Sequence, residues 1–223
     1  MGSRLFDRLK ADCADDWRAY TRHRFVEGLG DGSLPEDAFR RYLVQDYLFL
    51  IQFARAYALA AYKAQTLADI RATREGLGAI VDTELGLHVR ICARWGLSEA
   101  DLEGADEGSA TLAYTRYVLE AGHAGDLLDL LAALAPCVVG YAEIGRDLAA
   151  RPDTLVDSNP YREWIAEYSS DNYQAVAEAA RGTLDRLAGE LLAEARYPRL
   201  SKLFRNAVRL EADFWEQALA TAG

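Results

Sequence analysis

Helix-forming residues dominate this chain from one end to the other, and no other feature limits its fold as strongly. Alanine, leucine, arginine and glutamate fill long segments, and most of the five prolines lie where such segments end. No segment alternates apolar and polar residues between turn signals, as a half-buried strand would. The sequence therefore predicts an all-α protein, a single domain over residues 1–223 folded as a bundle of seven to eight helices.

Turn and capping signals predict where these helices lie. Gly28 and Gly30 are expected to end the first helix, and Ser33 with Glu36 has the form of a capping box that starts the second. A serine at position 98 is expected to cap a short segment. The longer helices are expected at residues 5–25, 36–65, 69–95, 109–120, 126–150, 160–195 with a break near 169–170, and 198–220.

The charge of the chain argues against partners that carry phosphate. Its 35 acidic and 25 basic side chains give a net charge of −10, and the basic residues are scattered. We therefore expect neither nucleic acid nor an anionic membrane as a partner. The longest uncharged run, residues 130–142, contains Pro136 and is too short to cross a bilayer, and the first residues lack a signal-peptide core. Three cysteines far apart encode no disulfide framework. We expect a soluble, cytoplasmic protein.

A carboxylate interrupts an aromatic stripe in the second expected helix. Tyr42, Asp46, Phe49, Phe53 and Tyr57 recur at helical spacing and so share one face. An unpaired carboxylate is costly to bury, so Asp46 must be paired, protonated or ready to bind a ligand. Two interpretations stay open. Asp46 makes a buried hydrogen bond between helices, or it binds the polar edge of a ligand while Phe49 offers a ring face.

A cysteine follows a proline that lies inside an expected helix. Pro136 removes one backbone donor and opens the preceding turn, Cys137 comes next, and Tyr141 lies one turn further along the same face. A lone cysteine is usually an inert packing residue, and we interpret Cys13 and Cys92 in that way. For Cys137 the alternative is a reactive thiol.

A second carboxylate lies beside rings near the end of the chain. Glu211 shares a helical face with Phe214 and Trp215. Packing against rings would raise the pKa of its carboxyl, as a general acid at neutral pH requires. The competing interpretation is a surface glutamate on an amphipathic helix.

The histidines give little support for a metal site. Glu84 and His88 have a spacing that can hold a metal, but the chain has a single Glu-x-x-His sequence, at 120–123, whereas di-iron bundles use one on each of two helices. We therefore expect no metal or haem and interpret His88 as a hydrogen-bonded interior residue. A glycine-rich phosphate loop and a Gly-x-Ser-x-Gly elbow are also absent from the sequence.

The candidate residues, taken together and in order, resemble the TenA family, also called thiaminase II. The resemblance covers essentially the whole chain. It rests on Gln45-Asp46-Tyr47 with Phe49, on Pro-Cys-Val-Val-Gly-Tyr-Ala-Glu-Ile-Gly at 136–145, on Trp164-Ile165 with Tyr168-Ser169-Ser170, and on Glu211-x-x-Phe214-Trp215. The segment at 136–145 is the most specific of these motifs.

The resemblance implies a haem-oxygenase-like fold without haem, a homotetramer and no cofactor. It also implies hydrolysis of 4-amino-5-aminomethyl-2-methylpyrimidine to the hydroxymethyl compound in thiamin salvage, with thiamin as a further candidate substrate. By position, Cys137 corresponds to the family's nucleophile and Glu211 to its proton donor. The positions that correspond to substrate-binding residues are Asp46, Phe49, Tyr114, Tyr141 and Tyr168. Val139-Gly140 departs from a bulkier pair common in the family, which leaves the pocket volume open.

Two other classes of function compete with this hydrolase. A metal-dependent oxygenase could use the same helical scaffold, and the shortage of histidines argues against it; metal analysis would decide. A regulatory or interaction protein is the other, and the acidic charge without a basic helix argues against direct contact with DNA.

Overall fold

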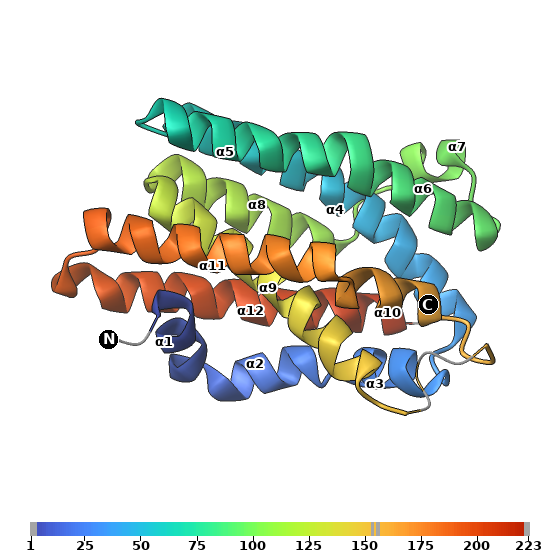
Figure 1. Cartoon of the computed structure of the whole chain (residues 1–223). Coiled ribbons are helices and arrows are strands. Elements are labelled where there is room, and N and C mark those ends of the chain that lie inside the picture. Colours follow the sequence, from blue (N-terminus) through green and yellow to red (C-terminus); the bar gives the residue numbers. More distant parts are fainter. Residues whose placement is uncertain (1–3, 153, 155–156, 221–223) are drawn as a thin grey trace. The chain divides into compact units, whose positions relative to one another are not determined.

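Every regular element in the described part of the chain is a helix (Figure 1). The structure is a computed structural model that describes residues 4–152, 154 and 157–220. Its twelve α-helices are α1 Leu5–Asp12, α2 Ala14–Thr21, α3 Arg24–Asp31, α4 Glu36–Lys63, α5 Leu67–Gly78, α6 Leu85–Arg94, α7 Glu99–Glu103, α8 Ser109–Ala124, α9 Leu127–Ala149, α10 Arg162–Ser169, α11 Asp171–Leu191 and α12 Tyr197–Leu219. The all-α prediction is confirmed, but seven to eight helices was too few.

The largest correction concerns the first expected helix, which divides into α1, α2 and α3. Cys13 and Arg22 leave helical backbone geometry although neither neighbours a glycine or proline. The predicted stop was also early: Gly28 and Gly30 lie buried inside α3, where Gly28 packs against Leu34. The helix ends instead at Gly32, whose φ of 75° favours a residue without a side chain.

Two other predicted starts can be compared directly with the structure. α4 begins at Glu36, so Pro35 rather than Ser33 precedes its first residue. The short α7 begins as predicted, because the Ser98 side chain accepts from the Asp101 backbone N–H and the Asp101 side chain accepts from the Ser98 backbone N–H. The break near residues 169–170 is also confirmed, since α10 ends at Ser169 and α11 begins at Asp171.

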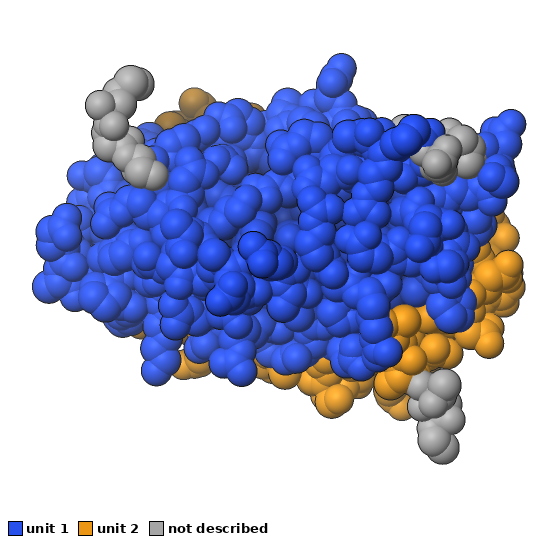
Figure 2. Space-filling model, turned by 90° about the horizontal axis from the view of Figure 1, so that it is seen from below, with its two compact units in different colours: residues 1–35, 131–216 blue, residues 36–130, 217–223 orange. Residues whose placement is uncertain are grey.

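The chain clusters into two compact units (Figure 2). Unit 1 comprises residues 1–35 and 131–216, and unit 2 comprises residues 36–130 and 217–223. The core of unit 1 contains a cluster of rings, in which Phe6 meets both Trp17 and Phe204 edge to face at 5.5 Å. In unit 2, α4 packs against α5, α6 and α8.

In unit 2, α5 and α6 form one continuous rod through the π-helical segment Ala79–Glu84, labelled η1. The backbone stays helical where α5 meets η1 and where η1 meets α6. A π turn contains an extra residue, so it rotates the faces of α6 relative to α5. This rotation determines which side chains of α6 face α4.

By length and apolar composition alone, α9 could cross a membrane. Within the structure, 83% of its most apolar stretch is buried in protein. Such burial is typical of the core helix of a globular domain, so the apolar character of α9 is accounted for by packing.

Candidate active site

The seven predicted site residues belong to both units. Unit 2 holds Asp46, Phe49 and Tyr114, and unit 1 holds Cys137, Tyr141, Tyr168 and Glu211.

In unit 1, Cys137 lies half-buried on α9, directly after the helix-interior Pro136. The Tyr20 hydroxyl donates to the Pro136 carbonyl at 3.4 Å, so α2 contacts α9 at the turn that carries the cysteine. Gly140 lies against the same ring: a Cβ at this position would come within 2.4 Å of Tyr20. The small residue at 140 is thus explained by the packing of Tyr20.

Aromatic rings surround the turn of α9 that follows Cys137. The Tyr141 ring lies 4.9 Å from the Tyr168 ring of α10 and 5.3 Å from the Trp215 ring of α12. Trp164 of α10 completes the cluster, at 5.8 Å from Tyr141 and 4.6 Å from Tyr168. The structure therefore brings two predicted site tyrosines together, and the rings that bear their hydroxyl groups pack against the rings of Trp164 and Trp215.

The close approach of α9 and α10 depends on a glycine. A Cβ at Gly145 would lie 2.5 Å from the Tyr168 backbone carbon and 2.8 Å from the Ser169 backbone nitrogen. The Gln174 amide then bridges the two helices, donating at 2.9 Å to the backbone carbonyls of Ala142 and Tyr168. These contacts fix the position of Tyr168 beside α9.

Glu211 is buried, with 1% of its surface exposed, so the interpretation as a surface glutamate is wrong. It lies on α12 one turn before Trp215, which is fully buried. Burial excludes most of the water that would otherwise solvate its carboxyl, and this is the setting in which a carboxylic acid can hold or deliver a proton.

In unit 2, Asp46 lies on α4 with 4% of its surface exposed. The Tyr42 hydroxyl, one turn earlier, donates to Asp46 Oδ2 at 3.1 Å. Burial raises the pKa of Asp46 to about 7, although the hydrogen bond from Tyr42 lowers it. Asp46 therefore exchanges a proton near neutral pH, which an exposed aspartate does not do.

His88 of α6 is the second polar neighbour of Asp46. Its Nδ1 lies 3.4 Å from Asp46 Oδ2, and its Nε2 lies 2.7 Å from the Leu43 carbonyl of α4. The prediction that His88 is a hydrogen-bonded interior residue is confirmed. Its contact with Asp46 was not foreseen, because a contact between helices distant in sequence leaves no periodic pattern to detect.

The rings of Phe49 and Tyr114 meet, with ring centroids 5.1 Å apart. The start of α8, which carries Tyr114, is held by Gln45 of α4. The Gln45 side-chain oxygen accepts from the Thr111 hydroxyl at 2.6 Å and from the Gly108 backbone N–H at 2.8 Å. Gln45 belongs to the motif around Asp46, and its structural role is to join α4 to α8.

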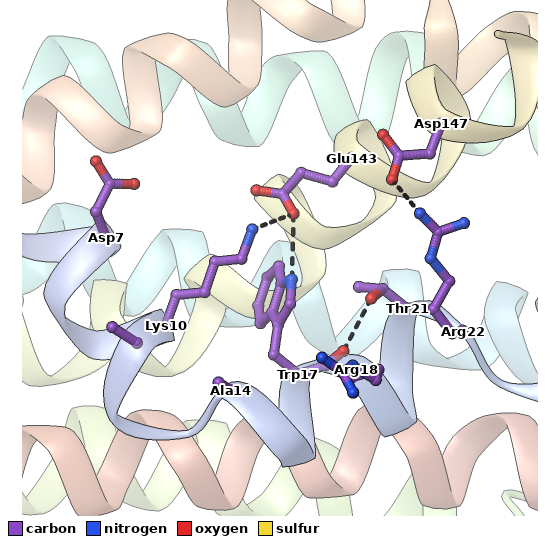
Figure 3. A pocket seen from close by; sticks show the side chains of 10 residues that line it. Asp7, Lys10, Ala14, Trp17, Arg18, Thr21, Arg22, Glu143 and Asp147 are labelled. Carbon is purple, nitrogen blue, oxygen red and sulfur yellow. Dashed lines mark hydrogen bonds and ion pairs between the residues drawn. The ribbon is translucent and has the colours of Figure 1, made fainter.

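A separate pocket of about 470 Å³ lies within unit 1, between α1, α2 and α9 (Figure 3). Two ion pairs line it: Glu143 accepts from Lys10 at 2.7 Å and also from the Trp17 indole N–H at 3.1 Å, and Arg22 bonds Asp147 at 2.9 Å. None of the seven predicted site residues lines it. Glu143, the glutamate of the 136–145 motif, thus joins α9 to α1 and α2.

The described residues contain no candidate metal site, because no three His, Cys, Asp or Glu side chains come together in a way that could hold an ion. The Glu84–His88 spacing does not lead to such a group either, since His88 Nε2 lies against the Leu43 carbonyl. Cys13 and Cys92, interpreted as packing residues, are both buried, with 4% and 0% of their surfaces exposed. Burial raises the pKa of the Cys13 thiol to about 11 and that of Cys92 to about 12.

Comparison with known proteins gives consistent matches across the chain. A model of the TENA/THI-4/PQQC family matches residues 11–221. An aminopyrimidine aminohydrolase of Halalkalibacterium halodurans is 38% identical over 202 residues, which cover 91% of this chain and 89% of that protein. A Silicibacter structure described as a TenA family transcription regulator is 44% identical, with a TM-score of 0.93 and 98% of each chain covered.

A more distant structure identifies the fold. A Shewanella denitrificans domain of unknown function, described as having a heme oxygenase-like fold, has a TM-score of 0.75 at 16% identity and covers 96% of this chain and 91% of that one. The expected haem-oxygenase-like helical fold is confirmed.

Proposed function

This chain belongs to the TENA/THI-4/PQQC family, and from that premise we propose that it is an aminopyrimidine aminohydrolase. The proposed reaction converts 4-amino-5-aminomethyl-2-methylpyrimidine and water to the hydroxymethyl pyrimidine and ammonia. Thiamin is the second candidate substrate, and the proposed setting is thiamin salvage. The name carried by the relative from Halalkalibacterium halodurans supports this class of hydrolase.

The observation that carries the proposal is the buried carboxyl of Asp46 in an aromatic environment. A carboxyl oxygen accepts the N–H of an exocyclic amino group, and burial removes the water that would compete for it. The neighbouring rings of Phe49 and Tyr114 suit a flat heteroaromatic ligand. We propose that Asp46 and these two rings bind the aminopyrimidine.

Cys137 and Glu211 are proposed to perform the chemistry. An amine is a poor leaving group, so direct displacement by water is slow. The Cys137 thiolate would add to the pyrimidine ring, and the electrons of the dearomatised ring would then expel the amine. Glu211 would donate a proton to the departing nitrogen and later take one from the water that attacks the covalent intermediate. The Cys137 thiolate then leaves the hydrated intermediate, which releases the product and restores the enzyme.

Tyr141 and Tyr168 are proposed to help bind the substrate. Their rings touch, and the wall formed with Trp164 and Trp215 fixes their orientation. Hydroxyl groups on such fixed rings provide polar contacts to a ligand at a small entropic cost.

The proposal is tested by incubating the purified protein with the aminomethyl pyrimidine and, separately, with thiamin. Mass spectrometry follows the hydroxymethyl product, and an enzymatic assay follows ammonia. Formation of both products from the first substrate, at a rate proportional to protein concentration, supports the proposal. If neither substrate yields the hydroxymethyl product, the proposal is contradicted.

Self-association and location are proposals of the same kind. We propose a homotetramer in the cytoplasm. Large apolar side chains exposed on unit 2 support self-association, because contact with another chain would remove them from water. These side chains are Ile51, Tyr62, Leu67, Ile70, Val81 and Leu112. Light scattering on the purified protein measures the number of subunits.

A further inference from the structure

Asp46 and His88 form a buried pair whose proton positions follow from their hydrogen bonds. A backbone carbonyl only accepts, so the 2.7 Å contact between His88 Nε2 and the Leu43 carbonyl requires a proton on Nε2. In a neutral imidazole this leaves Nδ1 with a lone pair. That lone pair faces Asp46 Oδ2 at 3.4 Å.

A lone pair and a carboxylate oxygen repel each other unless a proton lies between them. Both side chains are almost fully buried, with 7% of His88 and 6% of Asp46 exposed. Burial disfavours the charged form of each group: it lowers the pKa of His88 to about 4 and raises that of Asp46 to about 7. A buried imidazolium–carboxylate pair would bear the desolvation cost of two ions. The neutral pair, with the proton on Asp46, avoids this cost.

Burial and the Tyr42 hydroxyl are the influences on the pKa of Asp46 in the described residues. On α4, Tyr42 donates its hydroxyl proton to Asp46 Oδ2. On α6, Cys92 lies one turn after His88. Burial, with a smaller contribution from the nearby Asp46, raises the pKa of the Cys92 thiol to about 12. The ring of Tyr47 stacks on the ring of His88, with centroids 6.5 Å apart. The carboxylates of α7 raise the pKa of Tyr47 but do not influence the pKa of Asp46. Within the described residues, no cation influences the pKa of Asp46.

From this geometry we propose that His88 is a positioning residue that keeps Asp46 protonated and fixes the proton on Oδ2. Neutral His88 accepts this proton at Nδ1, and its own Nε2–H is anchored to the Leu43 carbonyl. The Tyr42 hydrogen bond and the His88 contact both use Oδ2. Oδ1 then acts as a carbonyl-like acceptor for the amino group of a ligand. This last step rests on the proposed function; the state of the pair does not.

The pair is tested first without substrate, by NMR of the full chain labelled with 15N-histidine. The sequence has three histidines, so three pairs of ring signals are expected, and His88→Gln identifies the pair that belongs to His88. Between pH 5.5 and 8.5 we expect His88 to remain neutral, with its proton on Nε2. Its Nδ1 shift should follow the ionisation of Asp46, with a midpoint near 7, and Asp46→Asn should abolish this midpoint.

A proton on Nδ1, or an imidazolium at pH 7, would overturn the proposal. Either result would mean that Asp46 is a carboxylate held by a donor. Because this measurement needs no turnover, it separates the two proposals. A protein that shows the expected tautomer but hydrolyses no aminopyrimidine refutes only the proposed function.

Two substitutions at His88 separate positioning from simple packing in the activity. Asn retains an amide oxygen near the position of Nδ1 and loses the contact with Leu43, whereas Gln retains a donor near the position of Nε2 and loses the acceptor that faces Asp46. We expect His88→Gln to raise KM for the aminomethyl pyrimidine about 10-fold with a smaller change in kcat. In the dependence of kcat/KM on pH, the same variant should move the basic limb about one pH unit lower. His88→Asn should leave that limb near the wild-type position. Equal shifts in both variants would contradict the positioning role.

Discussion

At the scale of single residues, Cys137 and Cys13 provide a matched comparison within unit 1. Cys13 is buried and donates to the Leu9 carbonyl at 3.3 Å, whereas Cys137 is half-buried beside a helix-interior proline. We expect Cys137→Ser to lower turnover by about 10²-fold or more, because an alkoxide is far less available than a thiolate near pH 7. Helical circular dichroism and subunit number should not change.

The control for this experiment is Cys13→Ser, since a serine hydroxyl can replace the thiol as donor to Leu9. Its activity should remain close to that of the wild type. Cys92 is a weaker control than the sequence suggested, because it lies close enough to Asp46 to influence its surroundings. A near-normal rate in Cys137→Ser would exclude the covalent mechanism.

Glu211 gives a prediction that compares two substrates on one protein. An aminomethyl nitrogen must be protonated in order to leave, whereas the thiazolium of thiamin leaves as a neutral thiazole. Loss of a positioned general acid typically costs about 10²–10⁴-fold. Glu211→Gln should therefore slow hydrolysis of the aminomethyl pyrimidine more than hydrolysis of thiamin, as measured by product formation from each.

The ratio of the two rates in a single Glu211→Gln preparation removes any error in active-site concentration. Some loss with thiamin is expected too, because the variant cannot activate water. An equal loss with both substrates would assign Glu211 to water activation or to substrate positioning. No loss with either would remove it from the mechanism.

At the scale of helices, two glycines of unit 1, Gly145 on α9 and Gly182 on α11, predict opposite outcomes for the same substitution. Gly145→Ala would place a methyl group 2.5 Å from the Tyr168 backbone, which cannot rotate away as a side chain can. Overpacking of this kind typically costs about 1–3 kcal/mol. We expect a lower Tm and, because Tyr168 must move, a higher KM for the aminomethyl pyrimidine.

Gly182→Ala on α11 is the matched control. No heavy atom lies within 4 Å of a Cβ built there, and alanine favours helix more than glycine does. This variant should gain up to about 1 kcal/mol in free energy of unfolding and keep its kinetics. If Gly145→Ala were equally stable, the close approach of α9 and α10 would not depend on the glycine.

The helices show which parts of the structure the sequence could predict. Local signals were sufficient for the all-α fold, the cap at Ser98 and the break after α10. They failed where tertiary packing decides: the breaks at Cys13 and Arg22 carry no local signal, and Gly28 lies inside α3 because Leu34 packs closely against it. For the candidate site, periodicity and resemblance identified Asp46, but its neighbour His88 comes from another helix.

At the scale of the whole molecule, Asp46 and His88 couple stability to pH with opposite signs. The pKa of Asp46 rises from 3.8 to about 7 on folding, so between these values the folded state holds a proton that the unfolded state has lost. This contribution lowers the free energy of unfolding by about 1.4 kcal/mol per pH unit as pH rises. The pKa of His88 falls from 6.5 to about 4, so its contribution rises with pH between these values. The two contributions offset each other from about pH 4 to 6.5.

Removing one member of the pair should expose the slope of the other. Relative to wild type, Asp46→Asn should gain free energy of unfolding by about 1.4 kcal/mol per unit as pH rises from 4.5 to 6.5. His88→Gln should lose it with the same slope up to about pH 5.5, above which the lowered pKa of Asp46 flattens the curve. Urea unfolding at one protein concentration measures the differences, so that any dependence on oligomer formation stays constant. Cys13→Ser is the reference, because the Cys13 thiol has a pKa of about 11 and does not titrate in this range. If the Asp46→Asn and His88→Gln curves both ran parallel to wild type, neither side chain would change its proton affinity on folding. The buried pair would then have no part in the response of the molecule to pH.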